Sequence, residues 1–402
     1  MSPSTTLVVL SHLRWDFVFQ RPQHLLSRLA SQQPVFFVEE PVHDAGATVP
    51  WLECRDAAPG VTVVRAHTAI AEPGFCDAQL AALGALLPDF LRERAGDERI
   101  AWLYTPLALP LVDAVAPTVL VYDCMDELSA FRFAPPSLLA REAALLERAD
   151  LVLTGGPSLY EARRERHSNV HCFPSSVDAK HFAPKPHLAD DAPSRTAREL
   201  HTPSQPPRFG FFGVIDERMD LELVAAVADR FPEAHVMMVG PVVKVDPAML
   251  PQRPNLHWLG QQPYEVLPRL VENWQVCLMP FALNESTRFI SPTKTLEYLA
   301  AGKPVVSTAV HDVEVLYRDV VRIGRDREGF LAACAAALAE TGEERRANQR
   351  AGAAAVARSS WDETARRIAD EIDACRIGRP AHAASVKVDG AAATARTAAR
   401  IA

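Results

Sequence analysis

The sequence predicts an α/β protein with two domains, each built on a doubly wound parallel sheet, that face each other across a cleft. Three observations support this fold class. Short apolar runs without polar alternation recur along the 402 residues, as is typical of parallel strands buried on both faces. Amphipathic segments alternate with these runs, which is the pattern of βαβ units. A proline-rich stretch divides the series into two similar halves.

The first series of elements spans residues 1–182, which we predict to be a Rossmann-like domain. We expect this domain to bind the acceptor, one of two ligands that meet in the cleft. It opens with an apolar run, a polar loop and a segment whose leucines share one helical face. The pattern continues until the apolar periodicity stops near Phe182. Strands are expected at residues 7–10, 35–38, 100–104, 118–122 and 150–154, and helices at residues 22–30 and 137–149.

Residues 183–207 contain six prolines and little apolar content, so we interpret them as an exposed linker. The pattern then restarts and defines a second Rossmann-like domain over residues 208–358. After residue 377 the chain is poor in large apolar residues, and we expect residues 377–402 to be disordered. In the second half, strands are expected at residues 208–212, 235–239, 256–259, 276–279 and 305–308, and helices at residues 221–231, 264–273, 292–301, 328–340 and 343–374.

Charge and cysteine usage restrict the class of partner. The 50 acidic residues outnumber the 42 basic residues and give a net charge of −8, which has the wrong sign for coating nucleic acid. The seven cysteines form no C-x-x-C pair and do not cluster with histidines at zinc-ligand spacing, as expected in a reducing compartment. The N-terminus has no basic region, and no apolar stretch approaches the ~18 residues of a membrane span. We therefore expect a cytoplasmic protein, with a peripheral contact to the inner face of the cell membrane left open.

The segment RFISPTKTLEYLAAGKPVV, residues 288–306, has the clearest helix boundaries in the chain. Ser291 is a good N-cap, Pro292 suits the first helical position, and Gly302 suits the end of the helix. Because the helix follows the strand at residues 276–279, its free N–H groups should point into the cleft. A helix start in that place is a ready anion site.

Two charged residues in this helix indicate the ligand. A cation in the first turn, Lys294, opposes the helix dipole, so we explain it by a bound polyanion such as a diphosphate. Glu297 shares its face and can accept hydrogen bonds from sugar hydroxyls. The alternative interpretation is a Lys–Glu pair on a solvated helix.

This segment resembles the donor-sugar signature of GT-B glycosyltransferases, particularly the retaining family-4 type with its E-x7-E motif and a small-small-Gly-Lys-Pro-Val-Val run. Glu297 matches the second Glu, which in that family contacts the nucleotide ribose, and Phe289 stands where the first Glu would fall. The Ser-Pro-Thr-Lys variant is similar to a subgroup of bacterial polysaccharide transferases. The resemblance implies that Ser291, Thr293 and Lys294 bind the donor near its phosphates.

The resemblance covers roughly residues 5–375. Ser176-Val177-Asp178 looks like the family's Gly-Val-Asp turn, and Ser360-Trp361 opens a C-terminal helix. In the family this helix crosses back onto the first domain. We therefore expect residues 359–376 to pack there.

The connection FFGVIDERMD, residues 211–220, supplies further donor candidates. Gly213 lets the backbone approach a ligand, and Arg218 can provide a second cation for the diphosphate. Val214 stands where the family usually has an Arg, so Arg218 is the remaining candidate; a solvated first-turn residue is the alternative. Successive strands end at Gly240, Gly260 and the pair Pro280 and Phe281. These residues could frame a nucleotide base, and backbone turns without ligand contact are the alternative.

The loop SHLRWDFVFQRPQH, residues 11–24, supplies the acceptor candidates. It contains no glycine, so it is not a G-x-G-x-x-G phosphate loop, which argues against a nicotinamide dehydrogenase. Its pattern looks like a group of bacterial glycosyltransferases that includes the teichuronic-acid biosynthesis enzymes. An indole that stacks and polar side chains that form directional hydrogen bonds suit a sugar acceptor. The alternative is that Trp15 is an ordinary core residue. The candidates are His12, Trp15, Asp16, Gln20 and Arg21.

Three carboxylates follow the strand at residues 118–122. Asp123, Asp126 and Glu127 could orient the acceptor hydroxyl, receive its proton or cap the next helix. A magnesium or manganese site is a further alternative. We expect no metal and no other cofactor, because Lys294 and Arg218 already supply positive charge for a diphosphate.

The sequence as a whole predicts a glycosyltransferase that moves a sugar from a nucleoside diphosphate to a glycan or lipid-linked acceptor in cell-surface polysaccharide biosynthesis. The resemblance implies retention of configuration. The expected catalytic residues are Arg218, Lys294, Asp123 and Asp126. The alternatives are a nucleotide-sugar 2-epimerase of the same fold and a non-catalytic scaffold that binds sugar nucleotides. The nucleotide base, the sugar, the linkage and the oligomeric state are not specified by the sequence.

Overall fold

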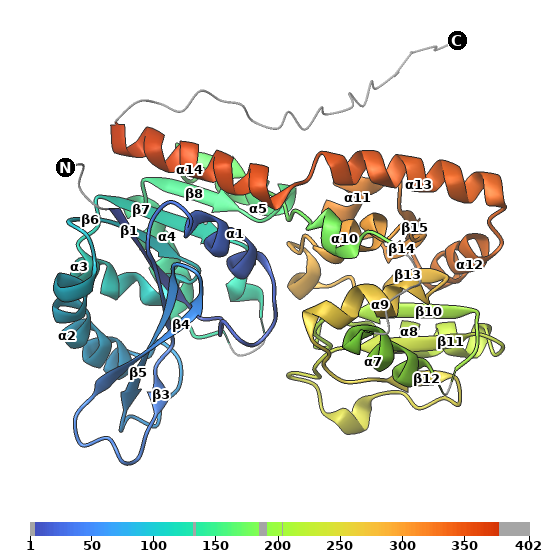
Figure 1. Cartoon of the computed structure of the whole chain (residues 1–402), viewed down its shortest axis with the longest axis horizontal. Coiled ribbons are helices and arrows are strands. Elements are labelled where there is room, and N and C mark those ends of the chain that lie inside the picture. Colours follow the sequence, from blue (N-terminus) through green and yellow to red (C-terminus); the bar gives the residue numbers. More distant parts are fainter. Residues whose placement is uncertain (1–4, 132–133, 185–190, 203, 378–402) are drawn as a thin grey trace, which may run out of the picture.

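The apolar runs of the sequence form the strands of two separate sheets. The structure, a computed structural model, describes residues 5–131, 134–184, 191–202 and 204–377, so the expected disorder after Ile377 lies outside the described residues. The two α/β domains lie side by side in Figure 1. The predicted fold class is confirmed.

The first domain contains a nine-stranded sheet within the described residues, in the order β3-β5-β2-β1-β6-β7-β8-β9, with β4 paired to β5. All pairs are parallel except β4 with β5. Residues 7–10 of β1 are fully buried, as expected for a central strand covered on both faces. The elements are β1 (Thr5–Ser11), α1 (Arg21–Leu29), β2 (Val35–Glu39), β3 (Val42–His43), β4 (Trp51–Ala58), β5 (Val61–Thr68), α2 (Asp77–Arg94), β6 (Glu98–Leu103), η1 (Pro106–Leu111), α3 (Val112–Val115), β7 (Val119–Cys124), η2 (Leu128–Ala130), α4 (Ser137–Arg148), β8 (Leu151–Thr154), α5 (Pro157–Arg163) and β9 (Val170–Cys172). The next helix, α6 (Ala179–Phe182), packs Phe182 into the core of the second domain.

The second domain contains a six-stranded parallel sheet in the part of the chain that the structure describes, in the order β12-β11-β10-β13-β14-β15. The elements are α7 (Ala192–His201), β10 (Arg208–Phe212), α8 (Leu221–Arg230), β11 (His235–Val239), η3 (Pro247–Met249), β12 (Leu256–Trp258), η4 (Tyr264–Val266), α9 (Leu267–Glu272), β13 (Val276–Met279), η5 (Glu285–Thr287), α10 (Lys294–Ala300), β14 (Val305–Thr308), α11 (His311–Tyr317), β15 (Arg322–Gly324), α12 (Arg327–Leu338) and α13 (Gly342–Ala357), and the chain then continues into α14 (Trp361–Ile377).

The topology of both sheets places a ligand site between them. In each sheet the first strand, β1 or β10, lies in the interior, and the next strands are added on its two sides. Ligands of open α/β sheets bind outside the carboxyl ends of the strands at such a switch point. The loops after β1 and β10, with those that follow neighbouring strands, are therefore placed to contact a ligand.

Several elements differ from the sequence-based expectation. The helical stretch expected over residues 343–374 is divided at residues 358–360 into α13 and α14, and α14 begins at Trp361, where the resemblance implied the start of a C-terminal helix. The helix expected at residues 264–273 starts as the 3-10 turn η4. Three elements were not expected from the sequence. Along β4 charged and apolar residues do not alternate regularly, whereas β5 does show a largely alternating burial pattern that was passed over. The third element, α2, has Pro88 in its interior.

The segment interpreted as a linker, residues 183–207, contains the helix α7. Asp191 caps its start by accepting a hydrogen bond from Ser194 N at 2.8 Å. Ala197 and His201 are buried, and Trp274 Nε1 donates to His201 Nε2 at 3.1 Å. This helix is held by the second domain, so the exposed connection that the prolines suggested is shorter than expected.

Helix α14 returns to the first domain after the chain has completed the second. Figure 1 shows α13 along the second domain and α14 along the first. Trp361 is buried and stacks on His24 of α1 with ring centroids 4.8 Å apart. Where the chain crosses, Val177 pairs with Ser360 in an isolated parallel bridge. The two connections between the domains therefore run next to each other.

Candidate active site

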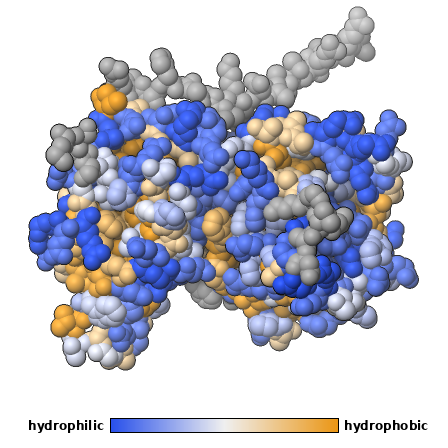
Figure 2. All heavy atoms as spheres, in the orientation of Figure 1, coloured by the Kyte–Doolittle hydropathy of each residue, from blue (hydrophilic) through white to orange (hydrophobic). Residues whose placement is uncertain are grey.

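A cavity of about 450 Å³ lies between the two domains. Residues from both sides line it, and they follow β1, β7 and β8 in the first domain and β10, β11 and β13 in the second. In the space-filling view the visible face is mostly hydrophilic, and hydrophobic residues also appear where the two lobes meet (Figure 2). The cavity is thus formed at the carboxyl ends of both sheets.

Lys294 and Gly213 meet on the second-domain side of the cavity. Gly213 has a φ of +143°, and a Cβ atom built there would lie 2.0 Å from Lys294 Cε. Because it has no side chain, Gly213 makes room for the Lys294 side chain, whose Nζ lies 5.8 Å from the centre of the Phe211 ring. Burial lowers the pKa of Lys294, and the nearby Glu297 raises it again in part.

Glu297 lies on the same helix, α10, and is only 7% exposed. Burial raises the pKa of its carboxyl to about 7, and Lys294 acts in the opposite direction. Near neutral pH this carboxyl changes charge easily. The cavity thus contains a cation and a titrating acid one helical turn apart.

Helix α10 begins later than the sequence analysis predicted. Its first helical residue is Lys294, and neither Ser291 nor Thr293 caps it through a side chain. Ser291 is instead packed against the first domain, because a Cβ atom on Gly156 would lie 2.7 Å from Ser291 Cβ. Pro292 precedes the helix and accepts from Thr295 N at 3.3 Å. The N-cap interpretation of Ser291 is therefore wrong, and the segment predicted as an anion site is a tight turn followed by a short helix.

Arg218 lines the cavity and already has a protein partner. Its guanidinium donates to both carboxylate oxygens of Asp216, at 3.0 Å from Nε and 2.6 Å from Nη2. It also lies over the ring of Phe131 from the first domain, 5.4 Å from the ring centre. This pairing fixes the direction of the guanidinium across the cleft.

The other donor candidates divide into two groups. Phe289, at the position of the missing motif Glu, packs against the core of the first domain and does not line the cavity. Pro280 also does not line it, and its carbonyl accepts from Asp220 N at 2.9 Å. The cavity is lined by Gly213, Phe281, Ser291, Thr293, Lys294 and Glu297.

The first-domain wall of the cavity is the loop after β1. Trp15 is 8% exposed and packs edge-on against Phe37 at 5.1 Å, so most of its ring belongs to the core. Phe17 and Phe19 are 40% and 44% exposed and also line the cavity. Phe19 stacks on Tyr264 of the second domain at 4.7 Å. The indole was the aromatic candidate from the sequence, and these two phenylalanines, two and four positions later in the same loop, were missed.

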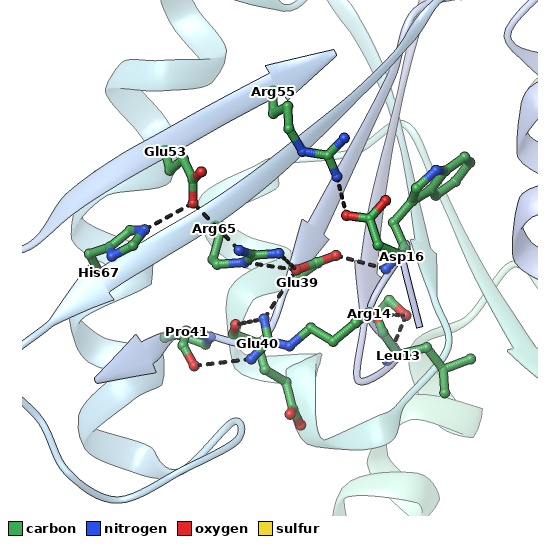
Figure 3. A network of polar contacts seen from close by, with 12 residues as sticks. Leu13, Arg14, Asp16, Glu39, Glu40, Pro41, Glu53, Arg55, Arg65 and His67 are labelled. Carbon is green, nitrogen blue, oxygen red and sulfur yellow. Dashed lines mark hydrogen bonds and ion pairs between the residues drawn. The ribbon is translucent and has the colours of Figure 1, made fainter. Parts of the chain in front are cut away.

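Asp16 and Gln20 lie in the same loop and both line the cavity. Asp16 forms an ion pair with Arg55 of β4, as Figure 3 shows. Gln20 N donates to Gln23 Oε1 at 3.0 Å, which closes the start of α1. His12 does not line the cavity, and burial lowers its pKa to about 4, with the Lys244 cation acting in the same direction.

Arg21 and Asp123 lie together although 102 positions separate them. Arg21 Nε and Nη2 donate to the Asp123 carboxylate at 3.1 and 3.0 Å, and Nη1 donates to Phe173 O at 2.7 Å. Asp123 is fully buried and does not line the cavity, whereas Arg21 does. Each of these two predicted site residues is therefore the partner of the other.

Asp126 is the carboxylate of this group that faces the cavity. Burial raises its pKa, and Arg218, Lys294 and Lys244 across the cleft act in the opposite direction. Glu127 accepts hydrogen bonds from Ser129 Oγ at 2.6 Å and Arg163 Nη2 at 2.5 Å. Among the described residues, no three His, Cys, Asp or Glu side chains are grouped to hold a metal ion.

The two facing α/β domains and the cleft between their carboxyl ends define the GT-B architecture. Residues 206–344 match a family described as "Glycosyl transferases group 1". The chain as a whole therefore has a GT-B-like fold, and its second domain matches the group 1 glycosyltransferases.

One curated relative supports the same class. Over 285 residues the chain is 25% identical to the putative teichuronic acid biosynthesis glycosyltransferase TuaH of Bacillus subtilis, covering 65% of this chain and 69% of the relative. Across residues 5–131, 134–184, 191–202 and 204–377, no helix is long and apolar enough to cross a membrane.

Solved structures agree with the fold over most of both chains. A sucrose-phosphate synthase from Thermosynechococcus elongatus has a TM-score of 0.67 and 16% identity, covering 91% of this chain and 97% of its own. HepE from Anabaena, in complex with UDP and glucose, has a TM-score of 0.66 and 14% identity, covering 92% and 99%. A trehalose-phosphate synthase from Burkholderia xenovorans, in complex with glucose-6-phosphate, has a TM-score of 0.64 and 12% identity, covering 92% and 100%.

Proposed function

We propose that this chain transfers a sugar from a nucleoside diphosphate to a saccharide or lipid-linked saccharide, with retention of configuration, in the synthesis of a cell-surface polysaccharide. The observation with the most weight is the pair Lys294 and Glu297, which stands in the cleft at the end of β13 beside a glycine that makes room for the lysine. The similarity to TuaH supports the polysaccharide context.

The donor would bind to the second domain. Lys294 and the N–H groups at the start of α10 hold the diphosphate, and Arg218 adds a second positive charge. Glu297, when ionised, accepts hydrogen bonds from the ribose hydroxyls. Gly213 and Phe281 complete this side of the cavity, while Ser291 and Thr293 shape the turn that precedes the helix.

The acceptor would bind against the first-domain loop. The exposed faces of Phe17 and Phe19 suit the apolar face of a sugar ring, and Asp16 and Gln20 offer hydrogen bonds. Arg21 and Asp123 form a buried pair that holds the start of α1 next to β7. The acceptor class, saccharide or lipid-linked saccharide, stays open, and we assign no contact with the membrane surface.

The reaction breaks the bond between the anomeric carbon and the diphosphate oxygen and forms a bond from that carbon to the acceptor oxygen. The departing oxygen keeps the bonding electron pair, and Lys294 and Arg218 stabilise its charge. Asp126 orients the acceptor hydroxyl and receives its proton. Burial already raises the pKa of Asp126, so the carboxylate is suited to hold that proton.

A panel of UDP-, GDP- and other activated sugars, read by thermal shift, identifies the donor, because a ligand of the native state raises its stability. Lys294→Met should then weaken binding of that nucleotide by about tenfold to a hundredfold, the value of a charge-assisted hydrogen bond. Lys180→Met, which removes an exposed lysine on α6, is the matched control and should leave binding unchanged.

Three outcomes contradict the proposal. Equal nucleotide affinity for the two lysine variants would remove Lys294 from the donor site. Inversion at C2 of the donor sugar would identify a 2-epimerase. Nucleotide-sugar binding without release of nucleoside diphosphate, with or without sugar acceptors, would identify a non-catalytic scaffold.

A further inference from the structure

The loop after β1 keeps one conformation through contacts to its main chain. Trp15 N donates to Glu39 Oε1 at 2.8 Å, and Trp15 O accepts from Gln23 Nε2 at 2.6 Å. Both main-chain polar groups of one residue are thus bound by side chains from other elements. The residues that line the cavity begin at this position and continue through Arg21.

Glu39 is the last residue of β2, and its side chain is completely buried. Besides Trp15 N, its carboxylate accepts from Arg14 Nη1 at 3.1 Å and from Arg65 Nε and Nη2 at 2.9 and 2.7 Å, as Figure 3 shows. A buried carboxylate is retained only where hydrogen bonds and opposite charges compensate for its desolvation. Here every compensating group belongs to the loop or to the strand beside it.

The strands β4 and β5 support the loop from the side away from the cavity. Arg65 of β5 contacts Glu39, and Arg55 of β4 forms an ion pair with Asp16 in the cavity wall (Figure 3). Arg65 also approaches Glu53 at 3.5 Å, and Glu53 pairs with His67 at 3.0 Å. The loop is therefore connected to an antiparallel strand pair that takes no part in lining the cavity.

We propose that Glu39 is a positioning residue for the acceptor wall. It fixes the main chain at Trp15 and, through Arg14 and Arg65, holds the loop against β5, so that Asp16, Phe17 and Phe19 stand where an acceptor meets them. This inference rests on the proposed function for the meaning of the wall. The anchoring of the loop can be tested without any substrate.

Hydrogen exchange of the full chain, read by mass spectrometry, tests the anchoring. Glu39→Gln keeps an oxygen for Trp15 N but removes the charge that holds the two arginines. We expect exchange in peptides covering residues 13–20 to become about tenfold faster, as for the loss of one charged hydrogen bond. Peptides from the second domain should exchange as in the wild type. Arg65→Gln is a second, partly exposed member of the same network and should act in the same direction.

The control is Glu142→Gln. Glu142 is also a buried carboxylate of the first domain, 5% exposed, and it is bound by Tyr122 Oη at 2.9 Å and Arg163 Nη2 at 2.8 Å without any contact to the loop. It should leave exchange at residues 13–20 unchanged. Equal exchange of the loop in Glu39→Gln and the wild type, or equal acceleration in Glu142→Gln, would overturn the proposal.

A kinetic measurement separates positioning from general weakening of the fold. With UDP-glucose as donor and methyl glucosides as acceptor probes, Glu39→Gln should raise the KM of the acceptor probe about tenfold. The KM of UDP-glucose and kcat should stay at their wild-type values. Equal changes in both KM values would reduce Glu39 to a structural role. If the wild type does not turn over UDP-glucose, UDP-glucose is not its donor, and the exchange experiment alone decides the anchoring.

Discussion

Glu297→Gln should remove from the stability of this protein a contribution that falls between about pH 4.5 and pH 7. Burial raises the pKa of this carboxyl to about 7 from an ordinary value of 4.5. In that range the folded chain keeps a proton that the unfolded chain has released. The contribution of Glu297 to the free energy of unfolding therefore falls as the pH rises through the range and is lowest above pH 7.

The size of the effect follows from the two pKa values. Each pKa unit corresponds to about 1.4 kcal/mol, so the gap amounts to about 3 kcal/mol for the ionised Glu297. A glutamine carries no charge at any pH and avoids this cost. Between pH 5 and pH 8 the wild type should lose stability relative to the variant by up to about 3 kcal/mol.

Urea unfolding of both proteins at pH 5 and pH 8 measures this difference directly. Glu328→Gln, which changes an exposed carboxylate on α12, serves as the control and should follow the wild type. UDP binding gives a second reading, since an ionised Glu297 accepts from ribose hydroxyls and wild-type affinity should rise through pH 7. The same pH dependence of unfolding in wild type and Glu297→Gln would refute a buried acid with a raised pKa.

Two further substitutions test the geometry of the cleft. Gly240→Ala should lower stability by about 3 kcal/mol and abolish UDP binding, because φ is +144° and the new Cβ would lie 1.8 Å from Gly213 O. The control Gly260→Ala, with φ +65° and open space around the new Cβ, should lower stability by only about 1 kcal/mol. Similar melting temperatures for the two variants would contradict this prediction. Asp312→Ala should cost about 1–3 kcal/mol in urea unfolding, because Asp312 Oδ1 accepts from Ser158 N across the domain boundary at 2.9 Å. Asp326→Ala, which removes an exposed helix cap, should cost about 1 kcal/mol, and a larger loss there would argue against the interdomain contact.

The sequence was most informative where burial is complete. Strands covered on both faces, such as residues 208–212 and 276–279, were predicted with the bounds that the structure has, because a short uninterrupted apolar run is typical of a strand with no solvent-facing side. The strand β4 was not predicted, since half of its side chains are exposed and the others are only partly buried. Local signals of burial therefore predict a strand covered on both faces better than one with an exposed face.

The candidate site shows the same division. Lys294 and Glu297 were chosen from one short helix and do lie together in the cavity. The pairing of Arg21 with Asp123 joins residues far apart in the chain, and nothing local distinguishes it from two free charges. The exposure of Phe17 and Phe19 is likewise a result of tertiary packing, because Trp15 takes the place in the core.

The return of α14 makes the second domain an insertion within the first. The chain leaves the first domain after Val177 and comes back at Ser360, and these two residues are bridge partners, with Val177 N donating to Ser359 O at 3.3 Å. A body attached by two adjacent strands of chain can swing about one axis and resists twisting about others. Opening of the cleft should therefore be a rotation of the second domain about a single axis at this crossing. The described ends of the chain, Thr5 and Ile377, both belong to the first domain and would not move with the second.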